Sequence, residues 1–457
     1  MKTKEKKSMI RFVIPLLGIL MLGVFAYTYI KMEKEIPALS LTPEFTSMGL
    51  RRDFTVSVSD HRSGLKSVKA VLIKDDKELL LFEEKFSASG FFSKGNLSGK
   101  SYPIGIETKR LGFSDGKATL KVSARDHSWR NWFNGNLGEL EREFVVDTRP
   151  PQLTVFSKFH YLNQGGTGLV VYKLSEPCPR SGVRVGDHFF PGYSGYFQDP
   201  LMHLAFFALD HQQGPGTKIH IEAMDAAENS IRGGFPHQIK ARVFKKDTLS
   251  ISDEFLHAKM PEFQGDLGKD ATGTPLDQFL KVNRTLREQN YRQVIDICRN
   301  SESKRYWEGV FLRLPNAGPQ AGFADQRDYS YQGKIIDRQF HLGLDLASLE
   351  RSMVPAANRG KVIFSNRLGI YGNTVILDHG YGVFSMYSHL SQFDVNAGQV
   401  VERGDIVGRT GVSGLAGGDH LHFSIIIQSV FVHPVEWWDP LWIEKRIEAK
   451  LKGTESE

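Results

Sequence analysis

Cysteines are rare in this sequence and its excess of charge is small, and both features exclude classes of protein. Only two cysteines occur in 457 residues, Cys178 and Cys298. They are far apart and belong to no C-x-x-C pair, so neither a zinc ribbon nor a disulfide framework is predicted. We expect two separate buried thiols. The balance of 58 basic and 52 acidic residues leaves a formal net charge of +6, which is too small an excess to indicate nucleic-acid binding.

One long apolar run stands near the N-terminus. Residues 12–30, FVIPLLGILMLGVFAYTYI, are 19 residues without a charge, about the length that crosses a bilayer. Five basic residues and one acid precede it, so the positive-inside tendency predicts a cytoplasmic basic tail at residues 1–11, a transmembrane anchor at 12–30 and the rest outside the cytoplasmic (inner) membrane. The alternative is a cleaved signal peptide. It is less favoured because the run is long and no small-x-small site follows.

Short runs with alternating polarity fill residues 36–247, among them DFTVSVS, ATLKVSA, REFVVD, LVVYKLS and KIHIEA. Alternation bounded by Gly, Pro, Asp and Asn predicts β-strands. One run repeats, because LKVSARD (120–126) aligns with IHIEAMD (219–225) at an offset of 99 residues. That offset is the size of one β-sandwich. We therefore predict two tandem immunoglobulin-like domains, at 36–148 and 149–247, hinged at DTRPPQ.

Each copy of the repeat ends in an aspartate, Asp126 or Asp225, and then meets an asparagine, Asn131 or Asn229. This pattern resembles that of bacterial immunoglobulin-like modules. Calcium binding is one explanation of the Asp and Asn. Turn formation is favoured, because both side chains readily hydrogen-bond to nearby backbone.

The period changes to a helical one after residue 248. Apolar residues in TPLDQFLKVNRTLREQNYRQVIDICRN recur at mostly three- and four-residue intervals, which predicts one or two helices. Thr274 is a plausible N-cap before Pro275. We interpret residues 248–306 as a helical connector and the glycine-rich, β-rich residues 307–446 as a last compact domain, so the chain is predicted to be mainly β.

Five side chains in this last domain form a candidate zinc site. In GGDHLHFSIII (417–427) a strand would place His420 and His422 on one face. HLGLDLAS adds His341 and Asp345, an imidazole and a carboxylate that suit zinc, and YSHL adds His389 at the end of a strand. A catalytic zinc site needs three protein ligands and an open position for water. Five groups are enough for this site and leave residues to handle protons.

The remaining histidines are predicted to be structural. His379, in LDHG, has the character of a core residue. A further set lies outside the domain without ligand-like spacing: His127, His160, His188, His203, His211 and His220.

The motifs HxxxD, Y-x-HL and HLHF, in this order and joined by glycine-rich spacers, resemble those of the lysostaphin/LytM-type zinc metallopeptidases. The resemblance covers roughly residues 311–434, including FADQR (323–327). It implies a LytM-type β-rich peptidase domain with one Zn²⁺ per chain, bound by His341, Asp345 and His422, and with His389 and His420 as catalytic residues. The family usually has glutamate after HLHF, where this chain has Ser424, and glycine–proline where it has GGD. Neither departure removes a ligand.

The family cleaves peptide bonds of peptidoglycan. The resemblance therefore implies a membrane-anchored D,D-endopeptidase that acts on cross-links during cell-wall remodelling or division. The alternative is a non-catalytic envelope scaffold that activates a peptidoglycan amidase, with the immunoglobulin-like domains binding envelope proteins. A resting state in which residues 248–335 cover the site, with Asn316 as an occluding ligand, is left open.

Overall fold

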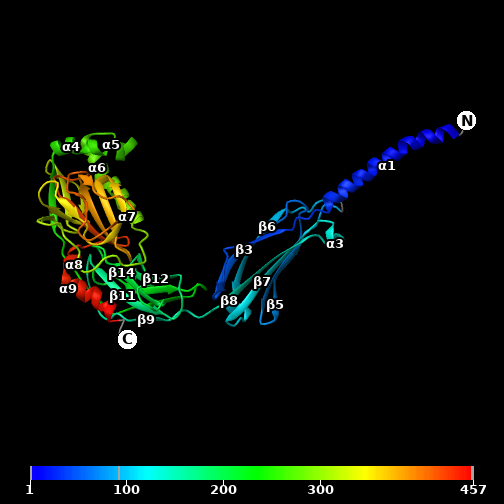
Figure 1. Ribbon diagram of the computed structural model, residues 1–457, viewed down its shortest axis with the longest axis horizontal. Coiled ribbons are helices and arrows are strands. Elements are labelled where there is room, and N and C mark those ends of the chain that lie inside the picture. Colours follow the sequence, from blue (N-terminus) through cyan, green and yellow to red (C-terminus); the bar gives the residue numbers. More distant parts are fainter. Residues whose placement is uncertain (1–2, 91–92, 454–457) are drawn as a thin grey trace. The chain divides into compact units, whose positions relative to one another are not determined.

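The computed structural model describes residues 3–90 and 93–453 (Figure 1). The chain forms two compact units, unit 1 with Met1–Pro150 and Asp225–Asn229, and unit 2 with Pro151–Met224 and Ser230–Glu457. The boundary after Pro150 lies within DTRPPQ. Strands dominate both units, which confirms the mainly β class. The individual domain boundaries proposed above, including those at residues 247 and 306, remain predictions.

Unit 1 begins with a single long helix, α1 (Thr3–Lys31). Its segment Phe12–Lys31 has a mean hydropathy of 2.1 over 20 residues, enough in length and composition to cross a membrane. A signal sequence near the N-terminus passes the same test. The transmembrane assignment therefore remains a prediction, and residues 1 and 2 of the predicted basic tail lie outside the described residues.

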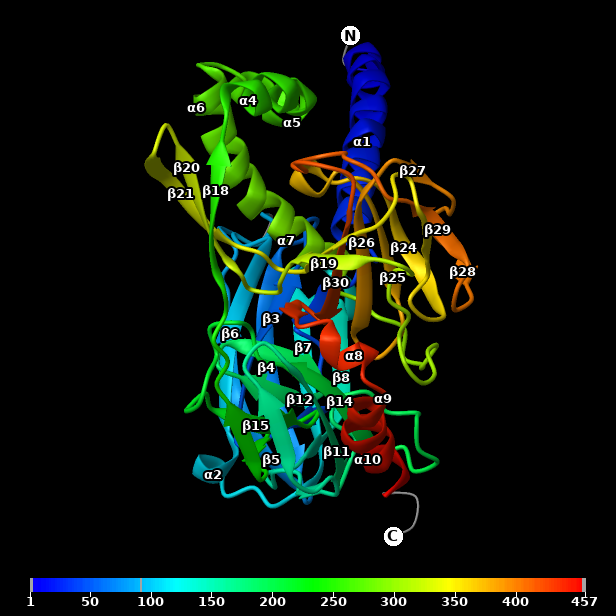
Figure 2. The same cartoon turned by 90° about the vertical axis from the view of Figure 1, so that its left-hand side faces the viewer.

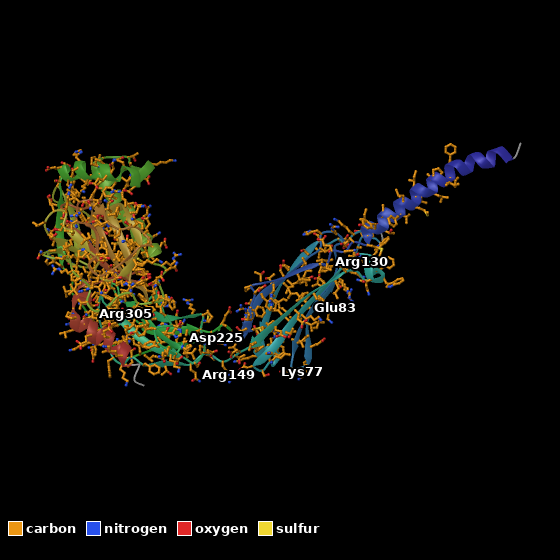
Figure 3. All side chains as sticks on the ribbon, viewed as in Figure 1. Lys77, Glu83, Arg130, Arg149, Asp225 and Arg305 are labelled. Atoms are coloured by element: carbon orange, nitrogen blue, oxygen red, sulfur yellow. The ribbon has the colours of Figure 1, made fainter. Side chains whose placement is uncertain are left out.

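Two sheets follow α1 and enclose the core of unit 1. Alternation places the apolar residues of each strand on one face, as in Phe54, Val56 and Val58, which are all buried. Lys77 and Glu83, labelled in Figure 3, lie on the outermost strand of the larger sheet, β5. One sheet has the order β1 (Ala38–Thr42), β3 (Arg51–Ser59), β6 (Gly99–Glu107), and the other the order β2 (Ser47–Met48), β8 (Leu137–Val146), β7 (Gly116–Asp126), β4 (Leu65–Lys74), β5 (Lys77–Lys85).

The sequence repeat lies on two equivalent strands, β7 and β15 (Ile219–Met224), but one asparagine was paired wrongly. Asn229 Nδ2 donates to Asp225 Oδ2 at 2.9 Å. The corresponding donor to Asp126 Oδ2 is Asn136, at 2.8 Å, and not Asn131. The reason is a longer loop after β7 that contains α3 (Arg130–Phe133), within which the Asn131 side chain donates to the Gly135 carbonyl instead.

Unit 2 contains a second set of packed sheets and the last domain around one continuous core. Phe206 of the sheets contacts Trp307 and Trp437, with ring centroids 6.3 and 6.2 Å apart. Figure 2 shows α9 and α10 beside β11 and β14. The elements here are β9 (Leu153–Val155), β10 (His160–Asn163), β11 (Thr167–Leu174), β12 (Arg180–Val185), β13 (His188–Pro191), β14 (Met202–Ala208), β16 (Ser230–Gly233), β17 (His237–Lys240), α8 (Val435–Trp438), α9 (Pro440–Ile443) and α10 (Ala449–Lys452).

The predicted helical segment is present and starts at the predicted residue. Thr274 accepts a hydrogen bond from the Asp277 amide at 3.2 Å, and the Asp277 carboxylate accepts one from the Thr274 amide at 2.9 Å. This capping box confirms Thr274 as the N-cap. The elements are β18 (Lys246–Ile251), α4 (Asp253–Lys259), α5 (Gln264–Leu267), α6 (Pro275–Lys281) and α7 (Arg287–Ile297).

The last domain is built on a large sheet with the order β19-β22-β30-β26-β25-β24-β28, and β31 pairs with β30. The β-rich character predicted for this domain comes from the runs KVIFS, NTVILDHG, VFSMYSHL and HLHFSIIIQ, which lie largely on β24, β25, β26 and β30. The strands are β19 (Gly318–Ala321), β20 (Gln326–Tyr331), β21 (Lys334–Phe340), β22 (Leu344–Ala347), β23 (Met353–Pro355), β24 (Gly360–Arg367), β25 (Asn373–Asp378), β26 (Val383–Leu390), β27 (Gln392–Phe393), β28 (Val400–Val401), β29 (Ile406–Arg409), β30 (Leu421–Ile427) and β31 (Val430–Val432).

Neither cysteine forms a disulfide. Cys298 is fully buried, as expected, and burial raises the pKa of its thiol. Cys178 is only half-buried, so the expectation of two buried thiols was right for Cys298 alone.

Candidate metal and catalytic site

Strand register brings two of the predicted ligands face to face. β22 and β30 are antiparallel neighbours, and Asp345 lies directly opposite His422. His341 precedes β22, and its Nε2 atom lies 2.9 Å from Asp345 Oδ1 and 2.9 Å from His422 Nδ1. The distance from His422 Nδ1 to Asp345 Oδ1 is 3.0 Å. Three side chains from two distant segments of the sequence thus converge on one point.

These spacings fit three ligands of one small ion. Zinc bonds to nitrogen and oxygen are about 2.0–2.1 Å long, so ligand atoms at the corners of a tetrahedron lie about 3.3 Å apart. The observed separations of 2.9 and 3.0 Å are slightly shorter than this value. All three side chains are buried, with 4 to 7% of their surface exposed.

In His341 and His422, the ring nitrogen that points away from the site donates a hydrogen bond. When the rings are neutral, the nitrogens that face the site, His341 Nε2 and His422 Nδ1, therefore carry no proton. His341 Nδ1 donates to the Gly322 carbonyl at 2.8 Å. Ser424 Oγ donates to the Leu342 carbonyl at 2.9 Å, so it accepts from His422 Nε2, which is 3.1 Å away. Two nitrogen lone pairs and a carboxylate oxygen therefore face one another. Such a donor set is completed by a cation at its centre.

A glycine is required beside this site. A Cβ atom at Gly343 would lie 2.5 Å from His422 Nε2 and 2.6 Å from Ser424 Oγ. Any larger residue would displace the contact that orients His422. Sequence analysis missed the roles of Gly343 and Ser424. The Ser424 departure was visible after HLHF, but its contact with the ring was not.

The two predicted catalytic histidines lie next to the ligands. The ring of His389 lies 4.8 Å from that of His420 and 5.8 Å from that of His422, measured between centroids. His389 and His420 each place Nδ1 2.8 Å from a backbone carbonyl, of Ser413 and Gly418 respectively. In the neutral rings Nδ1 donates these bonds, which leaves Nε2 of each ring free to accept a proton.

A bulge orients His389. The pairing of β25 with β26 shifts register between Asn373 and Val375, opposite the segment that contains His389. His389 itself has φ +61°, in the left-handed region that residues other than glycine seldom adopt. In a regular strand its side chain would point away from the face used by Ser388, which lies opposite His422. The bulge turns the imidazole toward the ligands.

The charge of Asp345 is strongly stabilised. Burial alone would raise its pKa, but the close imidazoles of His341, His420 and His422 outweigh burial and hold the pKa well below its usual range. Arg327 Nη2 also lies 2.8 Å from Asp345 Oδ2. Asp345 is therefore a carboxylate at neutral pH, as a metal ligand must be.

Burial and Asp345 shift the pKa values of the two predicted catalytic histidines in opposite directions. Burial, with the neighbouring His420 and His422, holds the pKa of His389 well below its ordinary value. Burial opposes ionisation of His420 as well, but its contact with Asp345 prevails and raises the pKa. Burial also lowers the pKa of His422 to about 4. Of these two rings, His389 is thus the one that favours the neutral form.

A cavity of about 570 Å³ opens over the five side chains. One side is formed by the ligands and the loop before His420. The other is formed by the segment before the domain, through Leu249 of β18, Phe279 of α6 and Arg287 of α7. Lys259 Nζ of α4 donates to the Val412 carbonyl at 2.6 Å and helps to hold this segment in place. Residues of this segment thus line the cavity, and the resting state considered for residues 248–335 stays a prediction.

Asn316 does not belong to the cavity. Asn316 is exposed, and the cavity wall instead includes Gln320, four positions later. The occluding role considered for Asn316 therefore receives no support from its position.

His379 is fully buried, with Nδ1 2.7 Å from the Arg359 carbonyl and Nε2 2.7 Å from Ser385 Oγ. Both ring nitrogens are thus used in the core, which agrees with the structural role expected for it. The six histidines before residue 248 that were set aside also lie away from the cavity lining.

Comparison with known proteins identifies the same region. Residues 339–434 match the model of Peptidase family M23. The chain is 37% identical over 97 residues to the DD-carboxypeptidase/endopeptidase Mpg of Neisseria meningitidis, covering 21% of this chain and 22% of that protein. It is 29% identical over 109 residues to the peptidoglycan DD-endopeptidase ShyB of Vibrio cholerae, covering 24% of this chain and 25% of that protein. The matches thus span about a quarter of each relative's length.

A crystal structure of a putative peptidase M23 from Pseudomonas aeruginosa aligns with 60% of this chain and 93% of its own, at 22% identity and a TM-score of 0.39. The match of residues 339–434 to the family model agrees with the lysostaphin/LytM resemblance. Residues 339–434 of this chain are a domain of Peptidase family M23.

Proposed function

We propose that this chain is a membrane-anchored zinc metalloendopeptidase that hydrolyses the peptide cross-links of bacterial peptidoglycan. One observation carries the proposal. Two imidazole nitrogens and a carboxylate oxygen converge at 2.9 to 3.0 Å, beside two further histidines that are each oriented by a hydrogen bond between Nδ1 and a backbone carbonyl. The M23 domain and the names of the relatives support the same reaction class and substrate.

The metal ligands in this proposal are His341 through Nε2, Asp345 through Oδ1 and His422 through Nδ1. When bound, Zn²⁺ supplies Lewis-acid activation of a water molecule and of the scissile carbonyl. Two neutral imidazoles and one carboxylate leave a net charge of +1 on the ion, which preserves this acidity. Ser424 and Arg327 orient His422 and Asp345 from behind.

The two unligated histidines handle protons. The Gly418 carbonyl orients His420, so its Nε2 atom faces Asp345 Oδ1 at 3.5 Å and is available to accept a proton from the attacking water. The protonated ring can then return that proton to the leaving amine. His389, held by the Ser413 carbonyl, accepts a hydrogen bond from the same water and positions it for attack.

Charge in the cavity favours a substrate with a free carboxylate. Arg287 lines the cavity, and within residues 3–90 and 93–453 it forms no ion pair. Its guanidinium donates to Asn283 Oδ1 at 2.6 Å, which orients it without neutralising it. Stem peptides of peptidoglycan carry free carboxylates, so we infer that Arg287 binds one of them and that D,D-cross-links are the bonds cleaved.

The proposed location follows from α1. An apolar helix preceded by basic residues would hold the N-terminus in the cytoplasm and the M23 domain outside the inner membrane. The domain would then meet peptidoglycan directly. The alternative, a non-catalytic activator of an amidase, is less supported because every ligand and both catalytic histidines are present and converge.

The test is a digest of purified sacculi with the full chain in detergent, loaded with one equivalent of Zn²⁺. We expect mass analysis to show cross-linked muropeptides converted to monomers, and Asp345→Ala to release none. If the wild-type chain released no monomers but accelerated a purified amidase, the scaffold alternative would replace the proposal.

A further inference from the structure

Three carboxylates converge in unit 1, remote in sequence from the M23 domain. Glu33 follows α1, Asp60 follows β3 and Asp126 ends β7, and one oxygen from each lies within 4.8 Å of the other two. Asp60 and Asp126 are 4% and 0% exposed. Like charges at this distance and burial repel strongly unless something compensates them.

Neutral donors hold two of the carboxylates in place. Asp126 Oδ1 accepts from the amides of Ser128 and Asn136 at 3.0 and 2.7 Å, and its Oδ2 accepts from Asn136 Nδ2 at 2.8 Å. Glu33 Oε1 accepts from Ser63 Oγ at 2.8 Å and from Asn136 Nδ2 at 3.2 Å. These dipoles orient the oxygens, but they add no positive charge.

Asp60 is the exception, because one of its oxygens is unpaired. Its Oδ1 accepts from the amides of Ser63 and Gly64 at 2.8 and 2.7 Å. Its Oδ2 is buried and has no hydrogen-bond partner. A buried carboxylate oxygen without a partner is costly, and it commonly marks an ion or water that completes the site.

No cation of the protein compensates the cluster. In the part of the chain that the structure describes, no Lys, Arg or His forms an ion pair with any of the three. Burial, together with the charge of Asp60, raises the pKa of Asp126 in spite of its hydrogen bonds. The three groups are therefore arranged around an uncompensated negative charge.

We propose that Glu33, Asp60 and Asp126 bind a calcium ion. The donors are all oxygens, which excludes the nitrogen and sulfur chemistry that zinc prefers and suits a hard cation. Three carboxylates from three separate segments form an irregular ligand set. Ca²⁺ accepts 6 to 8 oxygens in flexible geometry, whereas Mg²⁺ demands a near-ideal octahedron, so Ca²⁺ is the better match.

Calcium would join the segment after α1 to the sandwich. Asn136 Nδ2 also donates to the carbonyls of Glu33 and Glu35, at 3.2 and 3.0 Å, and Ser128 Oγ donates to those of Lys31 and Glu33, at 3.2 and 3.1 Å. Arg62 also pairs with Glu35 at 2.7 Å, and Arg130 Nε donates to the Met32 carbonyl at 3.0 Å, but neither cation pairs with the three carboxylates of the cluster. A shared ion would stiffen this junction.

The turn-forming role favoured for Asp126 is compatible with this site. The backbone amides of the turn donate only to Oδ1 of Asp60 and leave its Oδ2 available. The groups that donate to Asp126 are neutral amides, so they do not compensate its charge. The competing explanation is a proton shared between carboxyl groups, which needs no metal and would depend on pH alone.

The test uses the full zinc-loaded chain in detergent, freed of calcium with EGTA, and titrated with CaCl₂ at pH 7.5. We expect saturable binding with a Kd of about 10⁻⁴ to 10⁻³ M, as for extracellular calcium modules, and a rise in Tm. An equal concentration of MgCl₂ should produce a much smaller rise.

Asp60→Asn preserves the volume and should remove one equivalent of calcium relative to the wild type. Glu33→Gln, on a segment outside the core, should weaken the same site about tenfold or more without threatening the fold. The matched control is Asp53→Asn, an exposed carboxylate on β3 that pairs with Arg51. The proposal is overturned if wild-type Tm responds to pH but not to calcium, or if Glu33→Gln and Asp60→Asn both bind calcium as the control does.

Discussion

The two buried clusters of this protein differ chiefly in the atoms that face inward. In the M23 domain, two nitrogens and one oxygen converge from His341, His422 and Asp345. In unit 1, three oxygens converge from Glu33, Asp60 and Asp126. Each has an oxygen-bearing side chain at the end or edge of a strand, so the backbone frame is similar. Donor identity is the reason that we propose a borderline ion such as zinc for one cluster and a hard ion for the other.

The clusters also differ in how the protein compensates their charge. Arg327 lies 2.8 Å from the second oxygen of Asp345, whereas the second oxygen of Asp60 has no partner. The M23 cluster is therefore partly neutralised before any metal binds. The cluster in unit 1 is not, so we expect its ion to contribute more to local stability than to chemistry.

Selective chelation is the largest expected effect and the sharpest test of this contrast. Treatment with 1,10-phenanthroline should abolish peptidoglycan hydrolysis by removing zinc, and should leave the calcium-dependent rise in Tm unchanged. EGTA at a concentration that retains zinc should do the reverse. Metal content, hydrolysis and Tm are measured on the same samples. Loss of hydrolysis in EGTA with zinc still bound would break the separation.

Two substitutions within the M23 cluster should separate binding from proton transfer. Asp345→Ala should lose zinc and activity together. His420→Gln should keep stoichiometric zinc and lower kcat by about 10²–10⁴-fold, the usual contribution of general acid–base catalysis. Metal analysis and turnover of a cross-linked muropeptide measure the two effects. Zinc loss in both variants would make His420 a ligand and contradict the roles proposed here.

Ser424 is expected to have a smaller effect that acts through His422. Ser424→Ala removes the acceptor that holds His422 Nε2, and such outer contacts contribute about 10–100-fold to metal affinity. Competition with a zinc chelator measures the affinity independently of activity. Ser424→Thr should retain most of it, and Ser388→Ala, a buried serine on the adjacent strand, is the control. Equal affinities in all four proteins would show that the ring needs no orienting contact.

Arg287 is expected to have the smallest effect, limited to substrates with a carboxylate. Arg287→Gln should raise KM about tenfold, since a hydrogen bond to a charged group contributes about 1.5 kcal/mol, and should leave kcat nearly unchanged. Peptides with a free and an amidated carboxyl group are compared. Arg284→Gln is the control, because Arg284 pairs with Asp337 and lies outside the cavity lining. An equal change for the amidated peptide would contradict carboxylate recognition.

Local patterns were enough to predict most elements of the fold. Alternating runs became β3, β7, β11 and β15, and the capping signal at Thr274 marked the start of α6. These signals depend on neighbours in sequence. The pairing of Asp126 was misjudged because the length of a loop decides which asparagine returns to it.

The candidate site shows the same limit. The residue types and order of the five site residues were visible, but their contacts were not. The orientation of His389 depends on a bulge between β25 and β26, and that of His422 on Ser424 and the space left by Gly343. Bulges and close approaches arise from pairing between distant strands, so no single stretch of sequence contains them.

The sequence by itself determined the mainly β class, the apolar helix and the chemical types of the candidate ligands, because each depends on composition or short-range periodicity. Only the tertiary structure decided which donor atoms face one another, that Oδ2 of Asp60 is buried without a partner, and that α6 and α7 line the cavity of the M23 domain. These properties depend on long-range packing, which sets distances and burial that residue order alone does not contain.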